Sequence, residues 1–252
     1  MKKIAFSSLS VKYIDEISLL LTENKYVEWD INWTPISLSE NRMNNIKSIL
    51  QKSGEVRFHL PYGFWDIADM DELVWSNTHS YYLRLFSSIR HIGSNTAVLH
   101  IGNTLNTNPQ LAIKKLTDLA LEAKMYNVSL CLENLTHGLS SDMSFLKECM
   151  EIENVYFCLD IGHAEYMRRK FGNKIFDDIF QIKDKILHAH VYAYEDDNMN
   201  HIPFTETSLE NNIWFPFLLD TKCDWYTMEL DKIQDQIDQK KLIESFLANR
   251  GF

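Results

Sequence analysis

Six short apolar segments of this chain each end at a histidine or an acidic residue. In chain order they are Arg57–His59, Val98–His100, Leu130–Glu133, Cys158–Asp160, Leu187–His190 and Tyr226–Glu229. Imidazoles and carboxylates are the side chains that most often bind divalent metals and transfer protons. Because such residues recur along most of the chain, we expect one site built from many strand ends, as at the mouth of a barrel of parallel strands.

Segments rich in β-branched and aromatic residues alternate with longer helical patterns. The predicted strands are Lys3–Phe6, Tyr26–Ile31, Val56–Leu60, Ala97–Ile101, Val128–Leu132, Val155–Asp160, Ile186–Tyr192 and Trp225–Leu230. The predicted helices include Val11–Asn24, Asp71–His91, Pro109–Tyr126, Asp142–Glu151, Lys174–Lys183 and Lys232–Ala248. A strand, a crossover helix and another strand, repeated in this way, indicate a parallel sheet with right-handed connections.

This alternation predicts an α/β fold of the (β/α)8 TIM-barrel type. The length of 252 residues fits one such barrel, so we expect residues 1–252 to form a single domain. The competing architecture is an open doubly wound sheet, which would gather its ligands at one switch point rather than over most strands. The longest segments without a predicted element are Ile31–Ser39, Tyr62–Asp69 and Ala193–Asn212, and we expect irregular working loops there.

The composition favours a small-molecule partner over nucleic acid or a membrane. The chain carries 25 Lys and Arg against 35 Asp and Glu, a formal charge of −10, which disfavours a polyanionic partner. No segment has the length of an apolar membrane span, and the first residues lack the apolar core of a secretory signal. The four cysteines have no C-x-x-C spacing and are expected to be reduced and buried. We therefore expect a cytoplasmic protein, and the sequence leaves a homo-oligomer open.

Alternation of side chains along the later strands places four of the chemical residues together. The residues expected to point into the barrel mouth are Glu133, Asp160, His190 and Glu229. Those expected one layer deeper, as core or supporting residues, are Cys131, Cys158 and His188. Two carboxylates about 4 Å apart repel by about 4 kcal/mol at an effective dielectric near 20, so three of them require a cation. Oxygen ligands with one imidazole suit Mn²⁺, Mg²⁺, Zn²⁺, Co²⁺ or Fe²⁺, and the sequence predicts one such ion.

Structural roles are the alternatives for the same residues. Glu133 and Asp160 could cap the helices that follow them or pair with lysines. His190 could be a buried, hydrogen-bonded histidine of the core. Glu229 could exchange roles with Asp231, which has the same parity in the strand.

Several motifs together resemble the xylose-isomerase-like TIM barrels, a superfamily of sugar and sugar-phosphate isomerases and epimerases that is related to endonuclease IV. The motifs are Leu132–Leu135, Leu159–Ala164, the His-x-His of His188–His190, the late Glu229, His59–Tyr62 and Leu99–Gly102. The Leu-Asp-x-Gly-His-Ala sequence of Leu159–Ala164 is the most specific of these. The resemblance covers nearly the whole chain.

The resemblance implies roles for the residues that match the family pattern. In the sugar epimerases the positions of Glu133, Asp160, His190 and Glu229 bind one divalent metal, and the two glutamates also move protons. His163 would contact the substrate or act as an additional metal ligand, and the further substrate-binding candidates are His59, His100 and His201. A carbonyl bound to the metal is polarised, which lowers the barrier to removing the adjacent C–H proton. The implied function is isomerisation or epimerisation of a small sugar, sugar phosphate or polyol derivative.

Some residues depart from that pattern and keep other functions open. The segment His201–Thr207 is similar to the family's His-x-Pro-x-Gly-Glu-Gly loop, but threonine replaces both glycines. Endonuclease IV, a phosphodiesterase with a three-metal cluster, is the main alternative. It has an aspartate where this chain has Met199, and this difference disfavours the endonuclease function. The arginine that follows the seventh-strand histidine in the epimerases is absent from Val191–Thr207. A dehydratase or lyase acting on a cyclic polyol or keto-sugar is therefore a further alternative.

Two other groups of side chains accompany these motifs. The basic run Arg168–Lys170 is expected to be a solvated helix face, or else the place where a substrate phosphate is held. Aromatic residues gather in the predicted loops: Trp33, Tyr62, Phe64, Trp65, Tyr192, Tyr194 and Trp214. Trp65 is predicted to contact the substrate, because aromatic rings stack on the apolar faces of sugars. Loop packing or a subunit interface is the alternative role for these aromatic residues.

Overall fold

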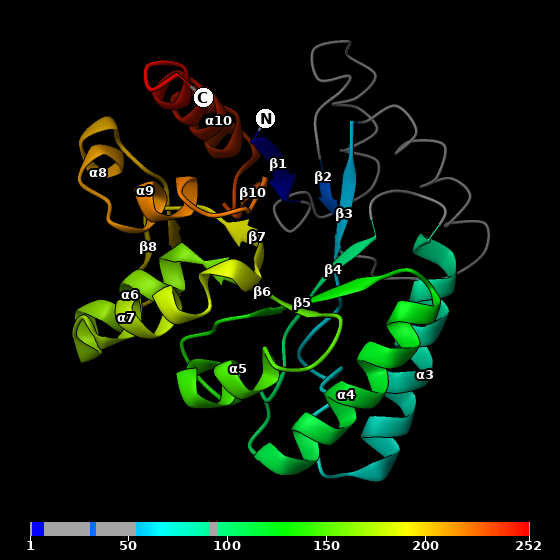
Figure 1. Cartoon of the computed structure of the whole chain (residues 1–252). Coiled ribbons are helices and arrows are strands. Elements are labelled where there is room, and N and C mark those ends of the chain that lie inside the picture. Colours follow the sequence, from blue (N-terminus) through cyan, green and yellow to red (C-terminus); the bar gives the residue numbers. More distant parts are fainter. Residues whose placement is uncertain (1, 8–30, 34–53, 91–94, 252) are drawn as a thin grey trace.

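Eight parallel strands form a closed barrel in the computed structural model, which describes residues 2–7, 31–33, 54–90 and 95–251 (Figure 1). The strands follow one another around the barrel in the order β1-β10-β7-β6-β5-β4-β3-β2. Their bounds are β1 Lys3–Ser7, β2 Ile31–Trp33, β3 Val56–His59, β4 Thr96–Leu99, β5 Ser129–Glu133, β6 Val155–Asp160, β7 Ile186–His190 and β10 Trp225–Met228. The structure confirms the TIM-barrel prediction and excludes the open doubly wound sheet.

The described helices cover the outside of the barrel, and α3 and α4 lie side by side (Figure 1). Their bounds are α3 Glu72–Ile89, α4 Pro109–Met125, α5 Met143–Cys149, α6 Ile161–Phe171, α7 Lys174–Gln181, α8 Glu206–Glu210, α9 Trp214–Leu219 and α10 Ile233–Ala248. Side-chain caps fix several of the starts. Asp71 caps α3, Asn108 caps α4 just before Pro109, and Asp142 caps α5. No helix among the described residues is long and apolar enough to cross a membrane.

The structure corrects the prediction in two regions. The segment Ala193–Asn212 is not one irregular loop, because it contains the antiparallel pair β8 Tyr194–Glu195 and β9 His201–Ile202, followed by α8. Similarly, Ile31–Trp33 forms strand β2, although an irregular loop was expected from Ile31 onward. Helix α6 follows β6 without any intervening loop and includes the helix face expected at Arg168–Lys170. The predicted helix Val11–Asn24, and the predicted second strand apart from Ile31, lie outside the described residues.

Side chains of the strands alternate between two buried environments. Those that face outward, such as Phe58, Leu132 and Phe157, join the large apolar core beneath the helices. Those that face inward form a separate small cluster around Val98, Cys131 and Cys158. This arrangement agrees with the predicted deeper layer. All four cysteines are free and buried, as expected.

Candidate metal centre and its cavity

The ends of four barrel strands bring three carboxylates and one imidazole to the same point. Glu133, Asp160 and His190 are the last residues of β5, β6 and β7, and Glu229 follows β10 directly. Each residue places a ligand atom within 4.8 Å of those of the other three. All four are buried, and the side chains of Asp160 and His190 have no exposed surface. The predicted metal ligands are therefore neighbours in space.

Several atoms of this group are buried without a hydrogen-bond partner in the described part of the chain. They are Asp160 Oδ2 and both ring nitrogens of His190. His190 Nδ1 lies 2.6 Å from Glu229 Oε2 and 3.3 Å from Glu133 Oε1, but in directions that do not satisfy hydrogen-bond geometry. Buried polar atoms normally have a hydrogen-bond partner. Three carboxylates around one nitrogen repel one another, and a cation between them would remove much of that repulsion. The donor set thus fits one divalent ion.

When no ion is bound, protonation of His190 offsets part of the negative charge of the group. Burial would raise the pKa of Glu133, but His190 and His100 hold it well below its usual range. Burial acts in the same direction on Glu229, and His190 lowers the pKa of that carboxyl to about 2. Burial would lower the pKa of His190, whereas neighbouring acidic groups, including Glu133 and Glu229, raise it well above its usual value. An imidazolium therefore occupies the centre of the group, and a metal ion would replace its proton.

Two further histidines contact the same glutamate. His59, the last residue of β3, and His100, which follows β4, place Nε2 at 3.3 and 3.0 Å from Glu133 Oε2. His59 Nδ1 donates to the carbonyl oxygen of Leu60 at 2.9 Å, so the Nε2 of a neutral ring has a lone pair facing the carboxylate. Both residues were predicted to bind substrate. The structure places them around Glu133, where either could also supply a ligand to a metal.

A second group lies next to the first and includes a residue that the sequence did not single out. Glu195 of β8 is buried, and its Oε2 lies 3.1 Å from His163 Nε2 and 4.0 Å from His201 Nε2. The β8–β9 pairing puts Glu195 directly opposite His201. His163 Nδ1 donates to the carbonyl oxygen of Asn134 at 2.9 Å, which leaves Nε2 to face the carboxylate. These three residues could also hold a metal ion.

The pKa of His163 shows how strongly this second group attracts a cation. Burial alone would lower this pKa, but the carboxylates of Asp160, Glu195 and Glu133 raise it to about 10. Burial raises the pKa of Glu195, and the hydrogen bond from His163 lowers it below its usual value. The pair is thus an imidazolium and a carboxylate at neutral pH.

Asn134 and Asp160 fix the geometry between the two groups. The Asn134 side chain donates to the Asp160 carbonyl oxygen and accepts from the Asp160 N–H, both at 2.9 Å. Asp160 is also the N-cap of α6, because its Oδ1 accepts from the His163 N–H at 2.7 Å while Oδ2 faces His190. One residue therefore ends β6, starts α6 and turns a carboxylate oxygen toward the candidate metal position.

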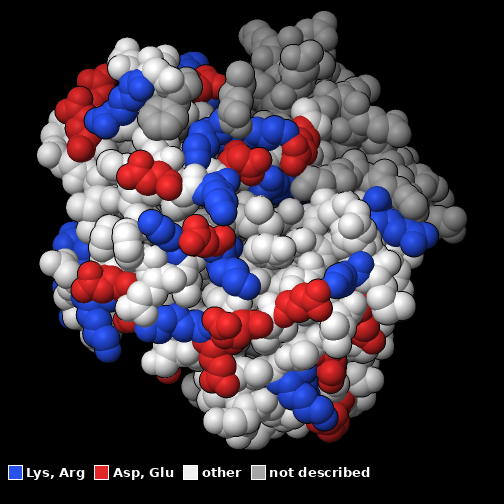
Figure 2. Space-filling view, in the orientation of Figure 1, with Lys and Arg blue, Asp and Glu red and all other residues white. Residues whose placement is uncertain are grey.

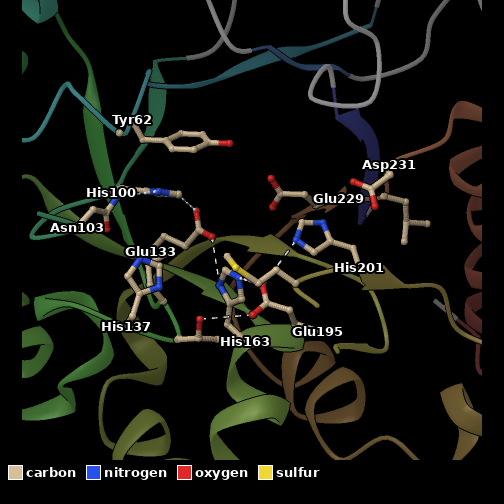
Figure 3. A pocket seen from close by; sticks show the side chains of 15 residues that line it. Tyr62, His100, Asn103, Glu133, His137, His163, Glu195, His201, Glu229 and Asp231 are labelled. Atoms are coloured by element: carbon tan, nitrogen blue, oxygen red, sulfur yellow. Dashed lines mark hydrogen bonds and ion pairs between the residues drawn. The ribbon is translucent and has the colours of Figure 1, made fainter. Parts of the chain in front are cut away.

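Both groups border a cavity of about 500 Å³ (Figure 3). It is lined by Tyr62, Gly63, His100, Asn103, Glu133, Leu135, Thr136, His137, His163, Glu195, Met199, His201, Glu229, Leu230 and Asp231. The predicted substrate-binding residues His100, His163 and His201 are among them, and His59 lies behind Glu133. Four of the described lining residues are acidic and none is lysine or arginine. Asp231 is exposed, so it does not take the place of Glu229 in the buried group.

Trp65 does not line this cavity. Its ring stacks on Tyr81 of α3, with centroids 4.2 Å apart, and it borders a different groove together with Phe64 and Arg84. The aromatic residue that does reach the cavity from the same loop is Tyr62, whose ring stacks on His100 at 4.5 Å. The placement of Trp65 gives no support to its predicted contact with substrate.

The basic run Arg168–Lys170 also lies away from the cavity. Arg168 and Arg169 both donate to the buried carboxylate of Glu165, and the Arg169 guanidinium lies 4.2 Å from the centroid of the Tyr194 ring. Their charge is therefore partly balanced within α6. On the face of the molecule shown in Figure 2, acidic and basic side chains are interspersed. That face does not offer the continuous basic surface that a nucleic-acid backbone requires.

Comparison with known proteins agrees with this architecture. An uncharacterized protein of Methanocaldococcus jannaschii is 24% identical over 231 residues, which cover 90% of each chain. A D-tagatose 3-epimerase-like protein has a similar structure, with a TM-score of 0.77 and 18% identity over 98% of this chain and 97% of the other. Endonuclease IV from Thermus thermophilus is also similar, with a TM-score of 0.66 and 14% identity over 98% of this chain and 99% of the other.

A family model extends this likeness to the sequence. The model of the xylose isomerase-like TIM barrel matches residues 23–244, which include every residue of the two groups described above. The resemblance inferred from the motifs is thereby confirmed. The chain belongs to the xylose isomerase-like TIM barrel family.

Proposed function

We propose that this protein is a divalent-metal-dependent isomerase or epimerase of a small sugar, sugar phosphate or polyol derivative. The observation that carries the proposal is the convergence of Glu133, Asp160, His190 and Glu229, two of which, Glu133 and Glu229, line the cavity. A divalent ion bound there would polarise a substrate carbonyl and make the neighbouring C–H bond more acidic.

The proposed proton transfer uses two glutamates. Glu133 and Glu229 both line the cavity, and β6 and β7 separate their strands in the barrel order, so they approach a bound molecule from different directions (Figure 3). In the metal-free protein His190 lowers the pKa of both carboxyls, so both are ionised. Removal of a proton by one glutamate and its return by the other would give an isomer or an epimer.

The charge of the lining favours a neutral, hydroxyl-rich substrate. With four acidic side chains and no lysine or arginine among the described lining residues, the cavity repels an anion unless several cations are bound. Tyr62, Asn103 and His137 offer hydrogen-bonding groups along the lining. A sugar or polyol can use such groups together with a single metal ion.

The test is metal content together with proton exchange. The chain should bind one Mn²⁺ or Co²⁺ ion, and Glu133→Gln should reduce this binding. A substrate found by screening sugars should exchange one C–H proton with deuterium of the solvent, and Glu133→Gln or Glu229→Gln should abolish that exchange. Asp231→Asn is a matched control, because it removes a carboxylate that lines the cavity outside the buried group. Full exchange in either glutamine variant would contradict the proton-transfer roles.

Phosphodiester hydrolysis is a second candidate function, and one specific observation favours it. The group of His163, Glu195 and His201 lies beside the first, and His59 and His100 meet Glu133, so the described residues could hold more than one ion. Several cations would offset the acidic lining and admit a phosphate. Two or three ions per chain, with cleavage of DNA at abasic sites, would favour this function over isomerisation.

A dehydratase or lyase would use the same carboxylates. Loss of water or of a carbon fragment also begins with proton removal next to a carbonyl. Product analysis distinguishes these reactions, because an isomerase or epimerase leaves the mass of its substrate unchanged.

A further inference from the structure

A buried layer that contains a thiol and an imidazole lies directly beneath the candidate metal group. Cys158 of β6 and His188 of β7 precede Asp160 and His190 by two residues, so their side chains point into the barrel one layer below. Neither has any exposed surface. A ligand atom of each lies within 4.8 Å of the other and of a ring nitrogen of His190. We call Cys158 and His188 the inner layer.

One ring nitrogen of His190, Nε2, needs a hydrogen-bond acceptor from this layer. Its Nδ1 lies among the carboxylates, at 2.6 Å from Glu229 and 3.6 Å from Asp160, and is therefore the nitrogen that would bind a metal. A neutral imidazole that binds through Nδ1 carries its proton on Nε2. That Nε2 is buried and has no hydrogen-bond partner among the described residues. A metal-binding histidine nearly always donates its second N–H to an acceptor, which fixes both tautomer and ring orientation.

The inner layer supplies acceptors at this position. His188 Nε2 is 2.9 Å from Thr227 Oγ1, which leaves its buried Nδ1 without a partner in the described part of the chain. The Cys158 sulfur can accept a hydrogen bond as well. His59 stacks on His190 with an interplanar angle of 23° and thus presents a ring face rather than a nitrogen.

We propose that Cys158 and His188 are positioning residues which accept the second N–H of His190 and so hold its Nδ1 toward the metal. The inference rests on the proposed metal site and adds to it the residues that orient its one imidazole. Neither residue needs to touch the metal or the substrate.

Neutrality explains why this layer carries a thiol and an imidazole rather than a carboxylate. A thiol and a neutral imidazole can each accept a hydrogen bond without adding charge. An acidic acceptor would place a fourth carboxylate beneath the three already present, at a fully buried position.

The test measures Co²⁺ affinity by competition with a chelator, using the full chain. Cys158→Ala and His188→Leu should each weaken Co²⁺ binding by about 10- to 100-fold, the usual effect of losing such a supporting partner. Cys158→Ser should recover much of the affinity, because a hydroxyl also accepts. Cys131→Ala is the matched control: Cys131 is a fully buried thiol of the same layer on β5, but it belongs to none of the metal-capable groups. It should leave Co²⁺ affinity close to that of the wild type.

The outcomes separate this inference from the proposed function. Wild-type Co²⁺ affinity in both Cys158→Ala and His188→Leu would overturn the inference while leaving the metal site intact. An equal loss of affinity in Cys131→Ala would overturn it as well, because the effect would then be general to the core. A strong thiolate-to-cobalt absorption band that disappears in Cys158→Ser would make Cys158 a ligand instead. If the wild type binds no Co²⁺, the proposed metal site itself is wrong and the inference fails with it.

Discussion

Replacing Gly162 by alanine should destabilise the protein through a single steric contact. Gly162 lies in the first turn of α6, and a Cβ at this position would be 2.0 Å from Cε2 and 2.2 Å from Cζ of Tyr192. The Tyr192 ring is fully buried and stacks on His201 at a centroid distance of 4.4 Å, so it cannot move aside freely. Because the contact is far below van der Waals distance, the helix or the ring must shift.

The magnitude follows from two opposing effects. Overpacking of a core typically costs about 1–3 kcal/mol, and a contact this short should be at the upper end, about 3 kcal/mol. Alanine is favoured over glycine in a helix by about 1 kcal/mol, which offsets part of that cost. The expected net loss is about 2 kcal/mol in the free energy of unfolding, which corresponds to about 4–8 °C in Tm for a chain of this size.

A double-mutant cycle tests the reasoning. Urea unfolding should give the loss for Gly162→Ala in the wild type, but little loss or a small gain when Tyr192 is already Leu, because the clashing ring is then gone. Tyr192→Phe is the control background, since it keeps the ring and should keep the full cost. The same loss in all three backgrounds would refute the steric explanation.

Three further predictions concern other parts of the structure. The metal-free protein should lose stability as pH rises from 6.5 toward 10, because the His163 pKa is raised to about 10 and its proton stabilises the fold fully only below 6.5. His163→Gln should reduce this loss in urea unfolding, and the part that remains should come from His190, whose pKa is also raised. Asp66→Ala should cost about 3 kcal/mol in urea unfolding, because the buried carboxylate accepts three backbone N–H groups at 2.9–3.1 Å, whereas Asp66→Asn should cost less. Arg57→Met should cost about 2–3 kcal/mol in guanidinium unfolding, because the buried guanidinium donates to a β7 carbonyl at 2.9 Å and stacks on Trp225.

The sequence predicted helices best where a capping residue lies at the start of a segment with apolar residues at helical spacing. The helix expected at Pro109–Tyr126 is observed as Pro109–Met125, since Asn108 caps its start and proline suits its first position. Helix α6 was expected only through the helix face at Arg168–Lys170, and its start was not predicted. Only Ile161–Glu165 are buried, and the rest of the helix is half-buried or exposed, so no buried apolar stripe runs along it.

The sequence predicted the positions of candidate site residues that end barrel strands. It did not predict the residue whose orientation depends on the β8–β9 hairpin. Parity within β5, β6 and β7 is enough to place Glu133, Asp160 and His190 at the barrel mouth. Glu195, by contrast, is followed by two further acidic residues, and the sequence alone does not say which of the three turns inward. The antiparallel β8–β9 pairing makes that choice by setting Glu195 opposite His201.

The double duty of Asp160 restricts how this position can change during evolution. Asparagine would still accept the His163 N–H and start α6, but it would lose the negative charge that Asp160 contributes to the candidate metal group. Glutamate would keep the charge, but its longer side chain is a poorer N-cap. Neither conservative replacement preserves both roles, so we expect substitutions at this position to be rare while the site is retained. An aspartate at this position in a related chain therefore indicates that the carboxylate of the candidate metal site is retained there.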